Sequence, residues 1–290
     1  MNTALHTPAS GWTRRATGHA GFMMGAALTA LLLFVAALSL VWQPWPPTEI
    51  DIPSKLQPPS AAHWLGTDGL GRDIVSLLLV GAQASIVVGV VAVSIGLVLG
   101  VALGLLAAAQ HQAGRRWVDA LLMRAGDLTF AFPALLLAIL LTAIRGPGLF
   151  NSVLAIGIFN VPVFARITRN AARSVWARDF VTAARTAGRG AWGISRDHVL
   201  PNIASALIVQ ATISFATAIL AEAALSYLGL GVQPPQPSWG RMLNEAQALM
   251  FQAPWLALYP GLAIMLSVLG LNLLGDGLRD LLDPRLSRQR

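Results

Sequence analysis

Residues 74–110 read IVSLLLVGAQASIVVGVVAVSIGLVLGVALGLLAAAQ, and no charged side chain interrupts them. A helix that crosses a bilayer needs about 20 mostly apolar residues, so this stretch is long enough for one crossing with residues to spare. It contains Gly100 and Gly104, a GxxxG pair of the kind that lets two membrane helices approach closely. The stretch predicts a helical membrane protein with one span over about residues 84–109.

The composition of the whole chain agrees with that prediction. Of the 290 residues, 55% are apolar and only 11% are charged, whereas an ordinary soluble domain has about 25% charged residues. The mean hydropathy is +0.63. This much apolar surface does not fit into one aqueous core, so a soluble globular enzyme, a disordered chain and a fibrous repeat are excluded.

Five further apolar runs bring the number of predicted membrane spans to six. Short loops of polar, glycine and proline residues separate the runs, without a soluble domain between them. The sequence therefore predicts an all-α integral membrane protein over residues 21–290, after a tail of residues 1–20. The six spans are expected at about residues 22–42, 84–109, 121–144, 149–170, 203–230 and 255–275.

The basic residues indicate the orientation. The chain carries 20 Lys and Arg against 13 Asp and Glu, a net charge of +7. If both termini are cytoplasmic, 16 of the 20 basic residues lie inside and 4 lie outside, and the opposite orientation inverts this ratio. Because cytoplasmic loops are enriched in Lys and Arg, we expect both termini inside. Membrane topology then explains the basic charge, and no nucleic acid partner is expected.

The polar segment 166–201, which this topology places inside, carries seven arginines. Its small residues predict two short helices, over 182–186 and 191–199, with Gly188 and Gly190 in the turn between them and an end near Leu200-Pro201. Such a pair would form a compact knob on the cytoplasmic face. The alternative is a solvated basic loop that only follows the charge rule.

The spacing in this loop resembles that of ABC-transporter permeases, whose pattern is Glu-Ala-Ala, three residues, Gly, eleven residues and Leu-Pro. In the family this loop docks into a groove on an ATP-hydrolysing partner. The small residues permit close docking, and Arg185 and Arg189 suit an acidic rim. Thr182 departs from the pattern, because the family has Glu there. The positions that match are Ala183, Ala184, Gly188, Leu200 and Pro201.

A second stretch, HWLGTDGLGRD at residues 63–73, precedes the second span. It resembles the signature of the second permease of dipeptide, oligopeptide and nickel ABC importers, and further likeness to this family runs over residues 20–285. Its glycines and carboxylates predict a tight charged turn at the outer surface, with Arg72 paired to Asp68 and Asp73. The turn would be a lip of the translocation pathway, a contact for a substrate-delivering protein, or a structural cap of the second span. The signature positions are His63, Leu65, Gly66, Thr67, Asp68, Gly71, Arg72 and Asp73.

Two carboxylates in or near the bilayer are candidates for the pathway or a gate, because charges there are costly. Glu222 is expected near the outer end of the fifth span, where it would face a substrate amine or pair with Arg241 or Arg72. Asp127 is expected near the inner end of the third span, where it would act in a gate or in helix packing. Arg124 lies three residues before Asp127, so the two can bond on one helix face.

Several chemistries have no signature in the chain. Cysteine is absent, no GxxxxGK[ST] phosphate loop occurs, and the five histidines are not spaced as metal ligands. We therefore expect no enzyme, no cofactor and no metal site. ATP hydrolysis is expected in separate subunits.

The resemblance implies a permease subunit in the bacterial inner membrane, forming half of the pathway of an ATP-driven importer of dipeptides or oligopeptides. The implied partners are a homologous permease, two cytoplasmic ATP-binding subunits, an extracytoplasmic binding protein and the lipid bilayer. Nickel or another small solute is the alternative substrate. A self-sufficient secondary transporter or channel, and a membrane scaffold, are the alternatives from other classes.

Overall fold

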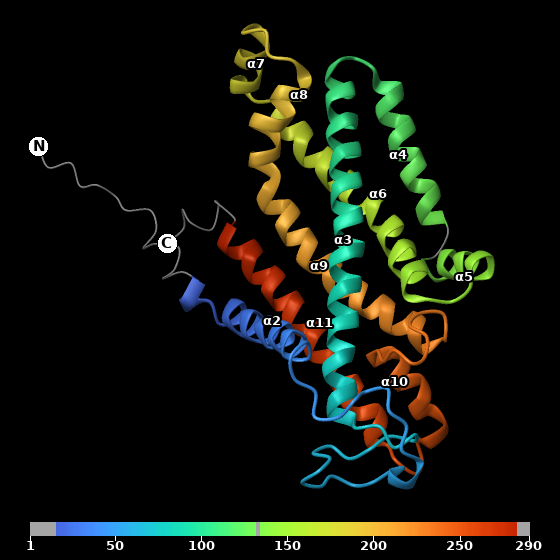
Figure 1. The fold of residues 1–290 in the computed structure, drawn as a ribbon. Coiled ribbons are helices and arrows are strands. Elements are labelled where there is room, and N and C mark those ends of the chain that lie inside the picture. The colour runs from blue at the N-terminus through green and yellow to red at the C-terminus, as the bar shows by residue number, and fades with distance from the viewer. Residues whose placement is uncertain (1–15, 132–133, 283–290) are drawn as a thin grey trace, which may run out of the picture.

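The computed structural model describes residues 16–131 and 134–282, and over these ranges the chain folds into a bundle of helices (Figure 1). The predicted N-terminal tail, residues 1–20, lies mostly outside the described residues. The helices in chain order are α2 (Ala20–Leu38), α3 (Ile74–Gln112), α4 (Arg116–Ala131), α5 (Ala134–Arg145), α6 (Leu149–Trp176), α7 (Asp179–Thr186), α8 (Ala191–Ile194), α9 (Leu200–Tyr227), α10 (Trp239–Ala246) and α11 (Trp255–Leu282).

Among the described residues, five helices are long and apolar enough to cross a membrane. They are α2, α3, α6, α9 together with α8, and α11. The third predicted span is different: α4 and α5 meet at an angle of 81°, so they form either one broken span or a re-entrant loop. The prediction of an all-α membrane protein is confirmed, and the third predicted span, over 121–144, falls on this bent pair.

Helix α3 is much longer than its predicted span, because it begins at Ile74 instead of about residue 84. The carboxylate of Asp73 caps it, since Oδ2 accepts a hydrogen bond from the backbone N–H of Ser76 at 2.8 Å. No proline follows before the helix ends at Gln112. At about 1.5 Å per residue this helix is longer than the bilayer is thick, so it reaches both ends of the molecule.

A row of glycines joins α3 to α6. A Cβ at Gly100 would lie 2.6 Å from the carbonyl oxygen of Val161 and 2.6 Å from Cβ of Phe164, and one at Gly104 would lie 2.6 Å from the carbonyl oxygen of Ala165. The predicted close packing of this GxxxG pair is therefore present. Without Cβ atoms at these positions, the two backbones pack as one unit.

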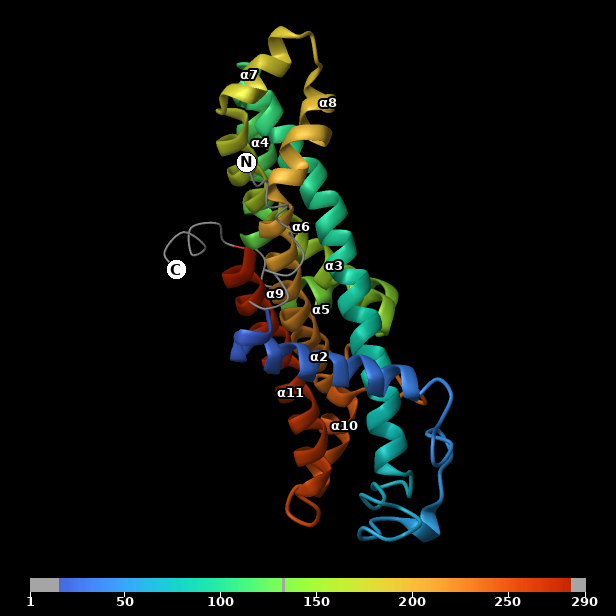
Figure 2. The same cartoon turned by 90° about the vertical axis from the view of Figure 1, so that its left-hand side faces the viewer.

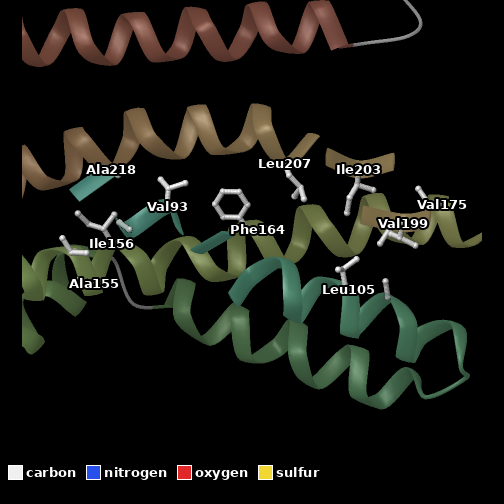
Figure 3. Close-up of a cluster of buried hydrophobic side chains, with 14 of the residues drawn as sticks. Val93, Leu105, Ala155, Ile156, Phe164, Val175, Val199, Ile203, Leu207 and Ala218 are labelled. Atoms are coloured by element: carbon white, nitrogen blue, oxygen red, sulfur yellow. The ribbon is translucent and has the colours of Figure 1, made fainter. Parts of the chain in front are cut away.

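Phe164 of α6 lies at the centre of the apolar core that α3, α6 and α9 form together (Figure 3). Its ring is fully buried and lies between α3, represented by Val93, and α9, represented by Leu207. Within a bilayer lipid is as apolar as this core, so close packing, more than removal from water, holds these helices together.

Two ends of the molecule are distinct in Figure 1. One end carries α7 and α8 beside the turn between α3 and α4; the other carries the segment 43–73, here called the outer loop, near α10. Figure 2 shows that α2 runs across α3 instead of along it. Helices α2 and α11 are in close contact, because a Cβ at Gly277 would lie 2.7 Å from Cα of Phe22.

The second short helix does not end near Leu200-Pro201 as predicted. One π-helical turn, Ser195–Val199, connects α8 directly to α9. Proline at 201 has no N–H to donate and would crowd the carbonyl group four residues earlier. The wider π turn, in which the N–H of Leu200 donates to the carbonyl of Ser195, relieves this crowding and lets the helix continue.

Candidate functional site

The best-formed surface feature is the α7–α8 knob, residues 179–194. Gly188 has a φ of +79°, a left-handed conformation that other residues rarely adopt, and it reverses the chain between the two short helices. The underside of the knob is fixed by Val181 and Ile194, which are buried in the same core as Val175 and Trp176. The knob is therefore a rigid projection and not a loose loop.

The outer face of the knob is open. Trp192 is 75% exposed and Phe180 is 42% exposed, so both rings are available for contact at the end of the molecule that lies beyond the long helices. Arg189 donates to Oδ2 of Asp197 at 2.6 Å, and this ion pair is about half exposed on both sides. Of the residues predicted for this site, the knob brings together Ala183, Ala184, Arg185, Gly188 and Arg189, whereas Leu200 and Pro201 begin α9 below it.

The outer-loop signature folds around the carboxylate of Asp68. Its Oδ1 accepts hydrogen bonds from the backbone N–H groups of Leu70 and Arg72, both at 2.8 Å. Its Oδ2 accepts from Nε of Arg72 at 2.7 Å. Gly66 and Gly71 have φ values of +81° and +80°, and Thr67 is fully buried. The predicted tight turn with an Asp68–Arg72 pair is present.

Asp73 does not pair with Arg72 as predicted. Its Oδ1 contacts Nδ1 of His63 at 3.0 Å, and its Oδ2 caps α3 through Ser76. The side chain points to the helix start because two donors of Ser76, the backbone N–H and the hydroxyl, lie there. His63 also packs on Trp45, with ring centroids 5.0 Å apart.

Arg72 has a second partner that the sequence did not indicate. Its Nη2 donates to Oε2 of Glu245 on α10 at 2.5 Å, and Nε of Arg241 donates to Oε1 of the same carboxylate at 2.9 Å. Burial alone would lower the pKa of Arg72, but the carboxylates of Asp68 and Glu245 outweigh it, and the pKa is raised. The four charges lie at a cavity of about 420 Å³ with an apolar side formed by Leu77, Leu249 and Leu256.

Glu222 is fully buried in α9, and its predicted pairing with Arg241 or Arg72 is wrong. Those arginines bind Glu245 and Asp68. Oε1 of Glu222 instead accepts from the hydroxyl of Ser226 at 2.7 Å, and that hydroxyl accepts from the N–H of Val232 at 3.0 Å. Glu222 thus secures the turn after α9 and does not face an open vestibule in this chain.

Asp127 pairs with Arg166 on α6 instead of Arg124 on its own helix. Arg166 also lies over the ring of Phe130, 4.6 Å from the centroid, and Phe130 meets Phe159 edge-on at 5.3 Å. The side chains of Arg166 and Asp127 are 45% and 58% exposed. This pair is an exposed polar patch between α4 and α6.

A buried polar cluster on the knob side was missed by the sequence analysis. Asp119 of α4, only 3% exposed, accepts from Nη2 of Arg169 at 2.6 Å and contacts Nδ1 of His111 at 2.8 Å. Arg173 lies 3.1 Å from Nε2 of the same histidine. The arginines at 166, 169 and 173 share one face of α6 at helical spacing, which was the available signal that a neighbouring carboxylate was needed.

No group of three or more metal-ligating side chains occurs within residues 16–131 and 134–282. A family model described as "Binding-protein-dependent transport system inner membrane component" matches residues 100–288.

The chain belongs to this family. The permease is therefore an inner-membrane component of a bacterial transport system. It is 47% identical over 271 residues to the di/tripeptide transport system permease protein DppC of Pseudomonas aeruginosa, a match that covers 91% of the permease and 88% of that protein. It is 46% identical over 277 residues to the glutathione transport system permease protein GsiD of Escherichia coli, covering 95% and 89%.

A third relative is the dipeptide transport system permease protein DppC of Alkalihalophilus pseudofirmus, at 47% identity over 238 residues, covering 82% of the permease and 77% of that protein. A solved structure of the methionine ABC transporter MetNI in an inward-facing conformation has a TM-score of 0.59 at 19% identity. That match covers 71% of the permease and 97% of the MetNI chain, and it supports the helical fold alone.

Proposed function

We propose that the permease forms half of the translocation pathway of an ATP-driven importer for dipeptides or oligopeptides. A homologous permease would supply the other half, two ATP-binding subunits would dock from the cytoplasm, and an extracytoplasmic binding protein would deliver the substrate. The α7–α8 knob carries this proposal. The substrate class is supported by the dipeptide, di/tripeptide and glutathione transport named for the relatives.

The knob has the properties expected of a docking element for an ATP-binding subunit. Its base is fixed by Val181 and Ile194, Trp192 is exposed, and the neighbouring arginines in the sequence, Arg185, Arg189 and Arg196, are exposed as well. An exposed aromatic side chain and basic residues favour a partner groove that is apolar in its centre and acidic at its edge. On this proposal the knob end is cytoplasmic, both termini lie inside, and the outer loop faces the binding protein.

The Asp127–Arg166 pair supports a position for the pathway. An ion pair with this much exposure is costly against lipid, so in the membrane it would face water or another protein chain. We assign the surface between α4 and α6 to the pathway, with Asp127 and the neighbouring aromatic rings as part of its gate. Glu222, which is fully buried, is assigned a structural role instead.

The outer loop is assigned to a lip of the pathway that also caps α3. Asp68 and Arg72 of the loop bind each other and Glu245 of α10 closely, and the cavity beside Arg72 and Glu245 lies between the loop and α10. A fixed lip of this kind gives a docking protein a constant surface. Gentle detergent extraction from the native membrane tests the assembly: a sister permease and P-loop ATPases should co-purify, and recovery of the chain alone would overturn the heteromeric proposal.

The substrate is tested by uptake into proteoliposomes that contain the complete complex. Radiolabelled dialanine should accumulate only with ATP and the binding protein, and nickel uptake without peptide uptake would favour the small-solute alternative. Gly188→Val in the same complex should abolish coupling of ATP hydrolysis to transport while the chain still inserts. A channel or a scaffold would be indifferent to that change.

A further inference from the structure

The inference below rests on the proposed function and concerns how movement of the knob reaches the pathway. Helix α4, which carries Asp127, has no fully buried apolar side chain: Asp119 is the one buried residue within Arg116–Ala131, all of which the structure describes. Polar contacts must therefore hold much of this helix in place: Asp127 pairs with Arg166 of α6 at an exposed site, and a second, buried attachment lies nearer the knob.

Asp119 provides that attachment through two neighbouring helices. From α6, Arg169 binds both carboxylate oxygens, Oδ2 at 2.6 Å from Nη2 and Oδ1 through Nε. From α3, Nδ1 of His111 lies 2.8 Å from Oδ2. A bidentate guanidinium–carboxylate pair fixes orientation as well as distance, so α4 is locked against α6 in both respects.

Arg173 completes the cluster one helical turn closer to the knob. A guanidinium group only donates hydrogen bonds, so Nε2 of His111 accepts from Arg173 and Nδ1 carries the proton that Asp119 accepts. Each polar group therefore has a donor or acceptor role that matches its neighbour. Losing the carboxylate would leave Arg169 and His111 without their shared acceptor.

The position of the cluster in the chain gives it its function. Only Ala177 and Arg178 separate the end of α6 from the start of α7, so the knob is a direct extension of the helix that holds Asp119. The α3–α6 pair is already rigid because of its glycine contacts. We propose that Asp119 is a positioning residue that makes α4 move with α6 when the knob is displaced, so that ATP binding moves the Asp127 face of the pathway.

Distance measurements test this directly, and the cysteine-free chain allows clean labelling. Spin labels at Leu121→Cys on α4 and Ser174→Cys on α6, both exposed positions, report the separation of the two helices in the complete complex. In the otherwise native permease we expect one distance that is the same without nucleotide and with ATP bound. In Asp119→Asn we expect a second, longer distance in the presence of ATP.

Transport gives a second readout that a purely structural role would not move. Asp119→Asn should lower dialanine uptake per ATP hydrolysed by about tenfold, the size of a typical coupling effect, while hydrolysis and assembly stay near normal. Asp119→Glu, which keeps the charge, should recover most of the loss. Asp280→Asn is the matched control, because it removes the exposed His19–Asp280 pair on helices that are not continuous with the knob, and it should change nothing.

Two results would overturn the proposal: an α4–α6 distance that changes with ATP in the native permease, or Asp119→Asn with native distances and native coupling. If Asp119→Asn does not assemble, Arg169→Lys gives the same two readouts, because it keeps the charge and loses the paired donors. A native complex without binding-protein-stimulated ATP hydrolysis would instead contradict the proposed function. The distances in the same sample would still show whether Asp119 holds α4 against α6.

Discussion

The two ends of the permease use charge in opposite ways. At the outer loop, Asp68, Arg72 and Glu245 bind one another, and Arg72 is only 8% exposed. At the knob end, Arg189 and Asp197 are about half exposed, and Trp192 is 75% exposed. The charges of the outer end thus bind one another within this chain, whereas the knob leaves its charges and its tryptophan exposed, as the proposed docking of a partner requires.

Gly71→Ala should have the largest effect, a strong destabilisation of the outer loop. A Cβ there would overlap the carbonyl oxygen of Asp51, and the φ of +80° is already unfavourable for alanine. We expect a loss of about 4 kcal/mol in the free energy of unfolding, enough to prevent stable purification. Thermal unfolding in detergent measures it. Gly146→Ala is the control, because its φ is +85° and its surroundings are open, so it should cost only about 1 kcal/mol.

Arg72→Ala should be the next largest effect. It leaves the carboxylates of Asp68 and Glu245 near each other without their shared cation. Because the side chain of Glu245 is 30% exposed and water can screen it, we expect a loss of about 2 kcal/mol and not more. Arg72→Lys should recover part of this loss. A thermal midpoint unchanged by Arg72→Ala would show that the outer end does not depend on its charges.

The contacts of the outer end differ in how far they could be predicted from the sequence. The outer turn, the Asp68–Arg72 pair and the GxxxG contact were predictable, because each is encoded within a few residues or one helix face. Glu245 was not, since it lies 173 residues from Arg72, and no local pattern joins them. Asp119 escaped for the same reason: its arginine is 50 residues away on another helix.

Other differences arose where a neighbouring group competed for a predicted one. The carboxylate of Asp73 accepts from the backbone N–H and the hydroxyl of Ser76 at the start of α3, and Asp127 pairs with Arg166 on the adjacent helix. The proline at 201 predicted a helix end, but one π-helical turn before it lets the helix continue. Local spacing shows which pairs can form, and the packed helices decide which of them do form.

Trp192→Ala tests whether the knob is a docking surface. The side chain is 75% exposed, so the free energy of unfolding should change by no more than about 0.5 kcal/mol. If the knob is a docking surface, affinity for the ATP-binding subunits should nevertheless fall about tenfold, as for an aromatic side chain at the centre of an interface. Titration of the purified permease complex with those subunits measures the change. Trp117→Ala, also exposed on this side but outside the knob, is the control and should leave the affinity unchanged.

Thr182→Glu should have the smallest effect. It introduces an acidic residue near the start of α7, three residues before Arg185, where helix dipole and side-chain pairing both favour it by about 0.3 kcal/mol. Helix stability should therefore rise slightly, with docking affinity changed by less than about twofold. A large gain in docking affinity would contradict this expectation, because it would show that the acidic group contacts the partner directly.

The uninterrupted path from α8 through the π turn into α9 has a mechanical consequence. A flexible connection transmits only a pull, whereas a continuous helix also transmits torsion. Residues 191–227 form one continuous helix, whose first turn belongs to the knob and whose other end carries Glu222. A partner that rotates the knob would therefore also rotate the far end of this helix, where the hydroxyl of Ser226 accepts the N–H of Val232, and the π turn at 195–199 marks the point where the winding already differs.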